Sequence, residues 1–399
     1  MGILDKFQRL ASSREALAEQ GVDPFATTVE SVLSATEAII NGRRTILAGT
    51  NNYLGLSFDP DCRAAASQAA QEQGTGTTGS RLANGSFGSH VALERELAEF
   101  FGTREAIVFP TGYTANLGML SALVGAQDTV LLDADCHASI YDGCRLSGAQ
   151  VMRFRHNDVD DLARRLRRLG ERAENTLIVV EGIYSMLGDR ASLGAICDVK
   201  DRYGAYLLVD EAHSLGILGE HGRGLAEEAG VAARSDFVVG TFSKSLGATG
   251  GFGASDHPEL ELVRYASRPY IFTASSSPSV IASTRTALGI LASRPELREQ
   301  LWSNAHHLYR RLADLGLRLG PEPSPVVAVH VDGQETALGL WSQLLQRGIY
   351  VNLMLPPATP DGTSLLRCSV SAAHTREQID YIADTFADLG DVMQSAATA

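Results

Sequence analysis

The chain is organised around the stretch Thr241-Phe-Ser-Lys-Ser-Leu-Gly-Ala-Thr-Gly250, which follows the short apolar run Phe237-Val-Val-Gly240. The apolar run predicts a buried strand, so Lys244 lies in the turn that leaves this strand. Hydroxyl residues and glycines surround the lysine, and they can hold an anion and let a bulky group approach. A lysine in such a turn can form a Schiff base with a phosphorylated aldehyde. The alternative is a surface lysine in a glycine-rich turn, and this stretch alone leaves both interpretations open.

The composition limits the classes of protein to which this chain can belong. Its 399 residues can bury a large core, and its length predicts two or three domains. A formal net charge of -13 argues against a nucleic-acid partner. The five cysteines form no CxxC pair, so we expect no disulfide framework and no metal site. Charged residues interrupt the N-terminal region, and no apolar run reaches the length of a membrane span. We therefore expect a cytoplasmic protein without a transmembrane segment.

From Glu105 onward, short apolar runs alternate with helical segments, and the runs cover residues 106–109, 129–132, 151–154, 177–180, 206–209 and 237–239. Continuous apolar runs of this kind are typical of strands that are buried on both faces. We therefore predict an α/β fold with a mostly parallel central sheet covered by helices. Ligands of such sheets bind beyond the carboxyl ends of the strands.

Polar residues with catalytic potential follow several of these strands. The segments Asp133-Ala-Asp-Cys-His137, Glu181-Gly-Ile-Tyr-Ser185 and Asp210-Glu-Ala-His213 each close a strand, as Lys244 does. Pro110-Thr-Gly-Tyr113 leads from a strand into a helix, and a helix N-terminus of this kind can bind an anion. A single histidine at a strand end is usually structural. Four strand ends that carry Asp, His, Ser and Lys side chains are hard to explain by packing, because loop residues there face solvent or a ligand.

The remainder of the chain predicts two further regions. A helix over Ile3–Glu19 and a small-sheet arm at Gly42–Leu47 come first. After residue 280 we expect two long helices separated at Pro295, then strands and helices of an α+β domain that ends in a helix capped by Thr375. The predicted domains are therefore an N-terminal arm (1–50), a large domain (51–280) and a smaller C-terminal domain (281–399). The glycine-rich segment Gly74–Gly85 either wraps an anion or forms a flexible loop.

Pyridoxal phosphate (PLP) would give each strand-end group a task. Lys244 would hold the aldehyde, Asp210 would keep the pyridine nitrogen protonated, and a protonated ring makes an amino-acid Cα–H acidic. His137 would stack on the ring, and the groups that can reach the ring hydroxyl are those of His213 and Ser185. Candidate phosphate ligands are the backbone of Gly112 and Tyr113 and the hydroxyls of Thr241 and Ser243. Arg367 either binds a carboxylate through its planar guanidinium or forms a surface salt bridge.

These motifs resemble those of the α-oxoamine synthases, a family of fold-type I PLP-dependent enzymes. The resemblance rests on Asn52-Tyr-Leu-Gly55, the three acidic strand-end segments and the stretch around Lys244, in that order, and it covers about residues 51–374. It implies a homodimer with its sites at the subunit interface. Thr273 would reach the partner's PLP phosphate, and the substrate carboxylate would be bound by Asn52 and Arg367.

Within the family, Gly74–Gly85, Pro356-Pro-Ala-Thr-Pro360 and Leu365–His374 most resemble the bacterial serine palmitoyltransferases. The implied reaction is a decarboxylative condensation of L-serine with a long-chain acyl thioester, which begins sphingolipid biosynthesis. Leu355 departs from the pattern, because some members carry an arginine there. The sequence leaves open whether coenzyme A or an acyl carrier protein carries the acyl group. Alternatives are sister enzymes that use glycine or alanine and a non-catalytic scaffold subunit, although such subunits lack the lysine.

Overall fold

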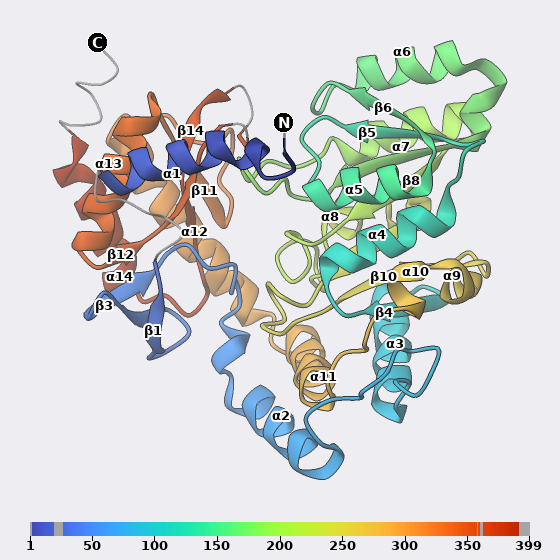
Figure 1. Ribbon diagram of the computed structural model, residues 1–399, viewed down its shortest axis with the longest axis horizontal. Helices are drawn as coiled ribbons and strands as arrows, with labels where there is room; N and C mark the ends of the chain where they lie inside the picture. The colour runs from blue at the N-terminus through green and yellow to red at the C-terminus, as the bar shows by residue number, and fades with distance from the viewer. Residues whose placement is uncertain (1, 20–26, 357, 360–361, 391–399) are drawn as a thin grey trace. The chain divides into compact units, whose positions relative to one another are not determined.

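The computed structural model describes residues 2–19, 27–356, 358–359 and 362–390. By compactness the chain divides into two units, one of residues 51–302 and one that joins residues 1–50 to residues 303–399 (Figure 1). The residues from 281 to 302 thus belong to the same unit as the central sheet. The three-domain division with a boundary at residue 280 stays a prediction. Among the described residues, no helix is both long and apolar enough to cross a membrane.

The unit of residues 51–302 is built on a seven-stranded sheet in the order β4-β10-β9-β8-β7-β5-β6. The strands are β4 (Glu105–Phe109), β5 (Thr129–Asp133), β6 (Gln150–Phe154), β7 (Thr176–Glu181), β8 (Tyr206–Asp210), β9 (Phe237–Thr241) and β10 (Gly251–Ser255). All six predicted strands are present, which confirms the mostly parallel α/β fold. The unexpected strand is β10, which pairs antiparallel with both β4 and β9.

Helices cover this sheet in pairs. The connections β4–β5 and β5–β6 advance along the sheet in one direction, whereas β6–β7 and β7–β8 advance in the other. Because such crossovers are right-handed, α4 (Gly112–Leu123) and α5 (Ala138–Ser147) share one face, while the opposite face takes α6 (Val159–Leu169) and α7 (Leu193–Tyr203). The members of each pair pack against each other (Figure 1). Burial on both faces explains why the strand sequences are continuously apolar, with the exception of the edge strand β6, in which only Phe154 is buried.

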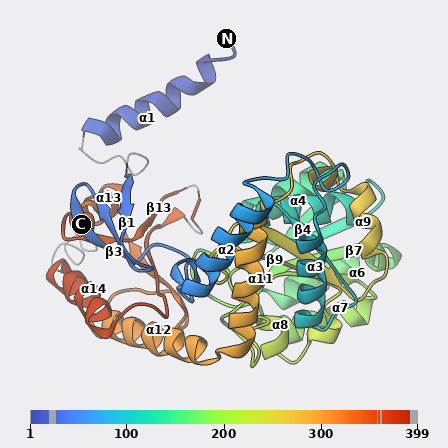
Figure 2. The same cartoon turned by 90° about the horizontal axis from the view of Figure 1, so that it is seen from below.

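The same unit holds a second group of helices, in which α11 (Pro278–Ser293) lies beside α2 (Pro60–Gln73) and α3 (Gly88–Phe101) (Figure 2). Proline begins both α2 and α11, where its missing N–H costs nothing. Asp59 and Ser277 cap these helices with their side chains. Short helices complete the unit: η3 (Leu56–Phe58), η4 (Gly170–Asn175), α8 (Leu225–Glu228), η5 (Ala232–Arg234), α9 (Leu260–Ala266) and α10 (Arg268–Ile271).

The other unit contains two small sheets. One has the order β1 (Val29–Val32), β2 (Glu37–Ile40), β3 (Arg43–Leu47) and β12 (Ile349–Tyr350), and the other has the order β11 (Val326–Val331), β14 (Ser364–Ser369) and β13 (Asn352–Met354). Its helices are η1 (Asp5–Phe7), α1 (Gln8–Glu19), most of α12 (Glu296–Asp314), α13 (Gln334–Gln346) and α14 (Arg376–Asp388). The predicted break at Pro295 and the capping box of Thr375 with Gln378 are both confirmed. Pro357 and Pro360 of the proline-rich segment lie outside the described residues.

Candidate active site

A cavity of about 270 Å³ lies where β7, β8 and β9 end and where α4 and α5 begin. Its wall includes eight of the predicted site residues, namely Gly112, Tyr113, His137, Asp210, His213, Thr241, Ser243 and Lys244. The prediction missed the other residues that line it, which are Thr111, Asn116, Ser139, Glu181, Ala212, Val239, Gly240, Thr249 and Gly250. The cavity thus brings together groups from five separate segments of the sequence.

Tight backbone contacts fix the turn that carries Lys244. The Thr241 Oγ1 donates to the Gly250 carbonyl at 2.9 Å, and the Gly247 N–H donates to the Lys244 carbonyl at 3.0 Å. Gly250 has a φ of 145°, and a methyl group there would lie 2.3 Å from the ring of Phe242. Only glycine fits this position, so the glycine cluster of the sequence holds the turn rather than loosening it.

The N-terminus of α4 forms one end of the cavity. Thr111 caps the helix, and its side chain and that of Thr114 form a reciprocal capping box. The N–H groups of Gly112 and Tyr113 have no partner within the helix, as is general for a first turn. The hydroxyls of Thr241 and Ser243 lie 2.9 Å apart in the same wall. Backbone N–H groups, hydroxyls and the helix dipole together suit a phosphate.

Asp210 provides a carboxylate at the end of β8. Its Oδ2 accepts a hydrogen bond from the Asn116 Nδ2 at 2.7 Å, and its Oδ1 accepts one from the Ala212 N–H at 2.9 Å. The residue is buried. Two donors from different elements therefore hold the carboxylate in one orientation inside the cavity wall.

His137 caps α5, and its Nδ1 accepts from the Ser139 N–H at 3.2 Å. Burial lowers the pKa of His137, and the charge of Lys244 lowers it further while that of Asp210 opposes the change. The His137 N–H donates to the carboxyl of Glu181. Burial and the Asp210 charge raise the pKa of Glu181 well above its usual value. The imidazole next to the lysine is therefore neutral near pH 7.

His213 lies at the start of the loop after β8, and its imidazole contacts the side chain of Tyr53. The Tyr53 hydroxyl lies 2.7 Å from the His213 Nδ1, and the two rings meet edge to face at 6.1 Å between centroids. Tyr53 is fully buried. Asn52, the preceding residue, donates through its Nδ2 to the Ser57 hydroxyl at 2.7 Å. The Asn52 loop therefore reaches the cavity through the Tyr53–His213 contact.

Four predicted site residues lie outside the wall of this cavity. Ser185 is buried in the loop after β7, Asn52 is half-buried, and Thr273 is half-buried between α10 and α11. Arg367 belongs to the other unit, where it is buried on β14 opposite Ala328 of β11 and Asn352 of β13. Their roles stay predictions.

Asp133, at the end of β5, serves a different purpose from the other strand-end groups. Its carboxylate lies 2.8 Å from the His156 Nδ1 and accepts from the Asn157 N–H at 2.8 Å. The second ring nitrogen of His156 lies 2.7 Å from the Asp189 carboxylate. This cluster of two buried carboxylates and the half-buried His156 joins the loops after β5, β6 and β7, and it holds the segments that lead to His137 and Ser185.

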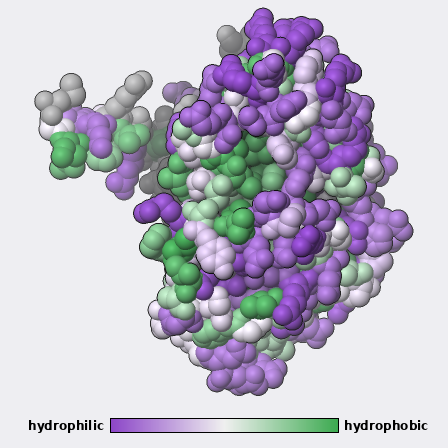
Figure 3. Space-filling view, turned by 90° about the vertical axis from the view of Figure 1, so that its right-hand side faces the viewer, coloured by the Kyte–Doolittle hydropathy of each residue, from purple (hydrophilic) through white to green (hydrophobic). Residues whose placement is uncertain are grey.

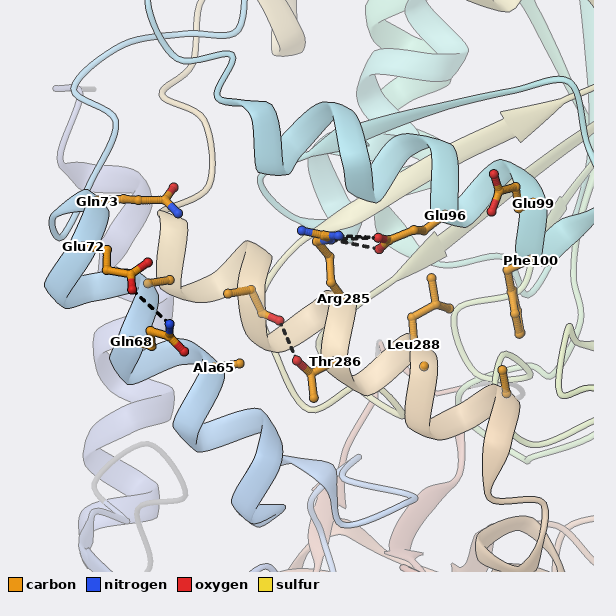
Figure 4. Close-up of a pocket in the computed structure, with 14 residues that line it drawn as sticks. Ala65, Gln68, Glu72, Gln73, Glu96, Glu99, Phe100, Arg285, Thr286 and Leu288 are labelled. Atoms are coloured by element: carbon orange, nitrogen blue, oxygen red, sulfur yellow. Dashed lines mark hydrogen bonds and ion pairs between the residues drawn. The ribbon is translucent and has the colours of Figure 1, made fainter.

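A second cavity, of about 680 Å³, lies among α2, α3 and α11 (Figure 4). Its charged groups include Glu72 and Glu96, and Figure 4 shows Arg285 turned toward Glu96, to which it is hydrogen-bonded. No lysine or histidine is among the residues that line it. The smaller cavity at the strand ends is therefore the candidate active site.

The smaller cavity has the groups that pyridoxal phosphate requires. It offers one amine, one carboxylate held by two donors, two imidazoles and an anion-binding helix N-terminus. Asn116 Oδ1 is buried in the wall and has no hydrogen-bond donor among the described residues. This donor set suits a ligand that combines a phosphate, a carbonyl carbon and a basic ring nitrogen.

Comparison with known proteins agrees with this chemistry. Residues 44–386 match the family model described as aminotransferase class I and II. The chain is 58% identical to a serine palmitoyltransferase of Caulobacter vibrioides over 390 residues, which are 98% of this chain and 96% of that protein. It is 38% identical to an 8-amino-7-oxononanoate synthase of Lysinibacillus sphaericus over 394 residues, with 98% and 99% of the two chains covered.

Solved structures give the same result. The structure of a Sphingomonas wittichii serine palmitoyltransferase matches with a TM-score of 0.96 at 52% identity and covers 99% of this chain and 100% of that one. A serine palmitoyltransferase structure containing a PLP internal aldimine matches with a TM-score of 0.96 at 51% identity, with the same coverage. The chain therefore belongs to the class I and II aminotransferase family and, within it, to the α-oxoamine synthases, whose members similar to it include bacterial serine palmitoyltransferases.

Proposed function

We propose that this protein is a PLP-dependent serine palmitoyltransferase, which condenses L-serine with a long-chain acyl thioester and releases CO2. The observation that carries the proposal is the convergence of Lys244, Asp210, His137 and His213 on one cavity. The 58% identity to a serine palmitoyltransferase over nearly the whole chain supports the choice of substrate.

PLP, when bound, supplies an aldehyde that joins an amine and a ring that withdraws electrons from the α-carbon. Lys244 would hold the aldehyde and later move the α-proton of serine through its Nζ. Asp210, with its orientation fixed by Asn116 and Ala212, would keep a proton on the ring nitrogen. The first turn of α4 would bind the phosphate together with Thr241 and Ser243.

The remaining assignments follow from the resemblance to the family. The ring hydroxyl would be contacted by His213 and Ser185, and His137 would stack on the ring and orient the Cα–H bond of serine. Asn52 and Arg367 would bind the serine carboxylate. Leu355 stands where some members have an arginine, so Arg367 would then carry more of the binding of that carboxylate.

We further propose a cytoplasmic homodimer in which Thr273 reaches the phosphate bound by the partner subunit. Large apolar side chains on α9 and on the segment before α11 support a protein partner, because Leu262, Tyr265 and Phe272 are between 62% and 72% exposed. Figure 3 shows hydrophobic residues gathered in patches on one face of the molecule. A second copy of the chain would cover such side chains.

A second candidate is a sister enzyme that condenses glycine or alanine, and the 38% identity to an 8-amino-7-oxononanoate synthase favours considering it. The two are distinguished by offering serine, glycine and alanine, each with palmitoyl-coenzyme A or palmitoyl-acyl carrier protein, and measuring CO2 release. We expect serine to react and the other two to be inactive. Activity with glycine but not with serine would overturn the proposal.

Borohydride reduction followed by peptide mapping tests the covalent residue. We expect the label on Lys244 and none in the Lys244→Ala variant, which should keep its fold and lose turnover. A label on Lys200, which forms an ion pair with Asp236, would contradict the assignment. An unlabelled protein would favour the scaffold subunit instead.

A further inference from the structure

A chain of hydrogen bonds joins Asp210 to His137 through Asn116, which so far only orients Asp210, and through Ser139, which has no role in the proposed mechanism. The Asn116 Nδ2 donates to the Asp210 Oδ2 at 2.7 Å and to the Ser139 Oγ at 3.0 Å. The Ser139 Oγ lies 2.8 Å from the His137 Nδ1. Asn116, Ser139 and Asp210 are all at most 4% exposed. The chain therefore runs inside the protein, from one wall of the cavity to the other.

The chemistry of these groups fixes the direction of the bonds from Asp210 as far as the Ser139 oxygen. A carboxylate only accepts hydrogen bonds, so Asp210 must face the amide nitrogen of Asn116. That nitrogen has two protons, and the second one goes to the Ser139 oxygen. The Ser139 hydroxyl has one proton and a second lone pair, so its contact with the His137 Nδ1 can run in either direction.

A second contact fixes the direction of this last bond. The backbone N–H of Ser139 also lies 3.2 Å from the His137 Nδ1. A backbone N–H can only donate, so this ring nitrogen must be an acceptor. A neutral imidazole carries its one proton on the other nitrogen, which is Nε2.

We propose that Asn116 and Ser139 are positioning residues that hold His137 as the Nε2–H tautomer, with Asp210 as the fixed end of the relay. The Nε2–H is then the donor that the ring offers to a molecule in the cavity, and a carboxylate or hydroxyl of an amino-acid substrate can accept from it. The proposed function supplies this catalytic consequence, whereas the tautomer follows from the contacts alone.

The position of Asn116 argues against a purely structural role. Its helix α4 is otherwise apolar where it packs against α5 and the sheet, and an amide buried there costs free energy unless it is hydrogen-bonded. An apolar side chain at residue 116 would pack against both neighbours without that cost. The amide is explained by its two N–H donors, of which one binds the Asp210 carboxylate and the other the Ser139 hydroxyl.

Long-range 1H–15N NMR correlations of protein labelled at histidine distinguish the two tautomers and need no turnover. The His137 resonances are identified by their loss in His137→Gln. We expect the Nε2–H pattern in the wild-type protein, both without and with PLP. The Ser139→Ala variant keeps the backbone donor but loses the shorter contact with the hydroxyl, so we expect the Nδ1 resonance of His137 to shift and the pKa of His137 to change.

Asn116→Asp gives a sharper test because it preserves shape. An aspartate next to Asp210 shares a proton with it and presents an acceptor to Ser139, which draws the hydroxyl proton away from His137. We expect the same NMR change as in Ser139→Ala and a fall in kcat of about tenfold, as is typical for one lost hydrogen bond in a catalytic site. Ser147→Ala is the matched control for Ser139→Ala, because Ser147 lies on α5 as Ser139 does and donates to the Cys144 carbonyl.

A wild-type spectrum with the proton on Nδ1 would overturn the proposal. So would unchanged His137 resonances in both folded variants. If Ser139→Ala fails to fold, the wild-type tautomer and Asn116→Asp still decide the matter. Failure of the proposed function would appear differently, as an inactive wild-type protein that nevertheless shows the Nε2–H pattern.

Discussion

A methyl group on Gly112 would lie 2.8 Å from the Cβ and the Oγ1 of Thr241. Thr241 cannot yield easily, because its Oγ1 is hydrogen-bonded to the Gly250 carbonyl and contacts the Ser243 hydroxyl. The first turn of α4 and the end of β9 are therefore packed so closely that only glycine fits between them. This contact positions the two parts of the proposed phosphate site relative to each other, namely the first turn of α4 and the hydroxyls of Thr241 and Ser243.

Gly112→Ala should weaken PLP binding. Overpacking costs about 1–3 kcal/mol, which corresponds to a rise in the PLP dissociation constant of about fivefold to 150-fold if the whole cost falls on binding. An absorbance titration of the apoprotein measures this constant. Gly194→Ala is the control, because a Cβ on Gly194 in α7 meets no atom within 4 Å. Equal PLP affinity in the two variants would contradict the close contact between Gly112 and Thr241.

His156 should make stability depend on pH in the alkaline range. Both ring nitrogens contact carboxylates, those of Asp133 and Asp189, so both must carry protons. Burial by itself lowers the pKa of His156, but these hydrogen bonds outweigh it and raise the pKa to about 10. The unfolded value is about 6.5. The stabilisation is therefore complete below about pH 6.5 and is lost as the pH rises toward about 10.

Replacing His156 by glutamine should destabilise the protein by about 3–5 kcal/mol at neutral pH, because two buried carboxylates lose their counter-charge. The loss should shrink as the pH approaches 10. Urea unfolding across this range measures it. His221→Gln is the control, since His221 also pairs with a carboxylate but its side chain is 59% exposed. A loss that is the same at every pH would contradict the charged imidazole.

Thr78 adopts a backbone conformation that disfavours its side chain. Its φ is 57°, and a β-branched residue in the left-handed region is strained. Thr78→Asn should stabilise the protein by about 0.5–1 kcal/mol, because asparagine tolerates this region. Thermal unfolding measures the change. Thr75→Asn, on an exposed residue with an ordinary φ, should have no such effect, and equal shifts in both would refute the explanation.

The strand-end part of the site could be predicted because its signals are local. Lys244, Asp210 and His213 each follow a continuous apolar run, and parallel strands bring their ends to one edge. The glycines near Lys244 could likewise be interpreted from sequence, since a turn with close contacts requires them. These parts of the site depend on the order of residues within single segments.

The helical part of the site could not be predicted in this way. Asn116 and Ser139 lie inside α4 and α5, where an asparagine or a serine is an unremarkable helix residue. Their importance arises from contacts with Asp210 and His137, which the packing of α4 against α5 creates. No pattern within one segment encodes such a contact.

One local signal in the sequence marks a hairpin of the small sheet, whereas strand β10 has no such signal. Asn41 and Gly42 both have positive φ values, 52° and 68°, between the paired strands β2 and β3. An Asn-Gly pair between two strands is a strong hairpin signal. Gly251–Ser255 is a strand despite its two glycines, because a Cβ at Gly253 would lie 2.4 Å from the sulfur of Met119 on α4. Tertiary packing there overrides the low strand propensity of glycine.

The loop after α2, for which the composition suggested either an anion-binding loop or a flexible one, is closely packed. Gly79 and Gly85 belong to a tight loop in which the Ser275 hydroxyl donates to the Gly85 carbonyl at 2.7 Å and the Ser275 N–H donates to the Gly79 carbonyl at 3.0 Å. A Cβ on Gly85 would lie 2.3 Å from the Gly79 carbonyl oxygen. The glycines permit close packing of a fixed loop rather than flexibility.

The Tyr53–His213 contact yields a final prediction. The buried Tyr53 hydroxyl lies 2.7 Å from the His213 Nδ1, and His213 lines the cavity. Tyr53→Phe removes one hydrogen bond from this imidazole, which should cost about 1–3 kcal/mol of stability. It should also weaken PLP binding several-fold and shift the pH dependence of the absorbance of the bound cofactor, because the His213 Nδ1 loses the partner that orients the ring.

Tyr309→Phe separates these effects. Tyr309 lies in the other unit, and its hydroxyl donates to the Gly320 carbonyl at 2.8 Å, so its loss removes a comparable hydrogen bond. We expect both variants to lose stability and only Tyr53→Phe to change PLP affinity and the absorbance titration. If Tyr53→Phe loses stability alone, the hydroxyl supports the fold without orienting His213, and the coupling between the Asn52 loop and the cavity does not exist.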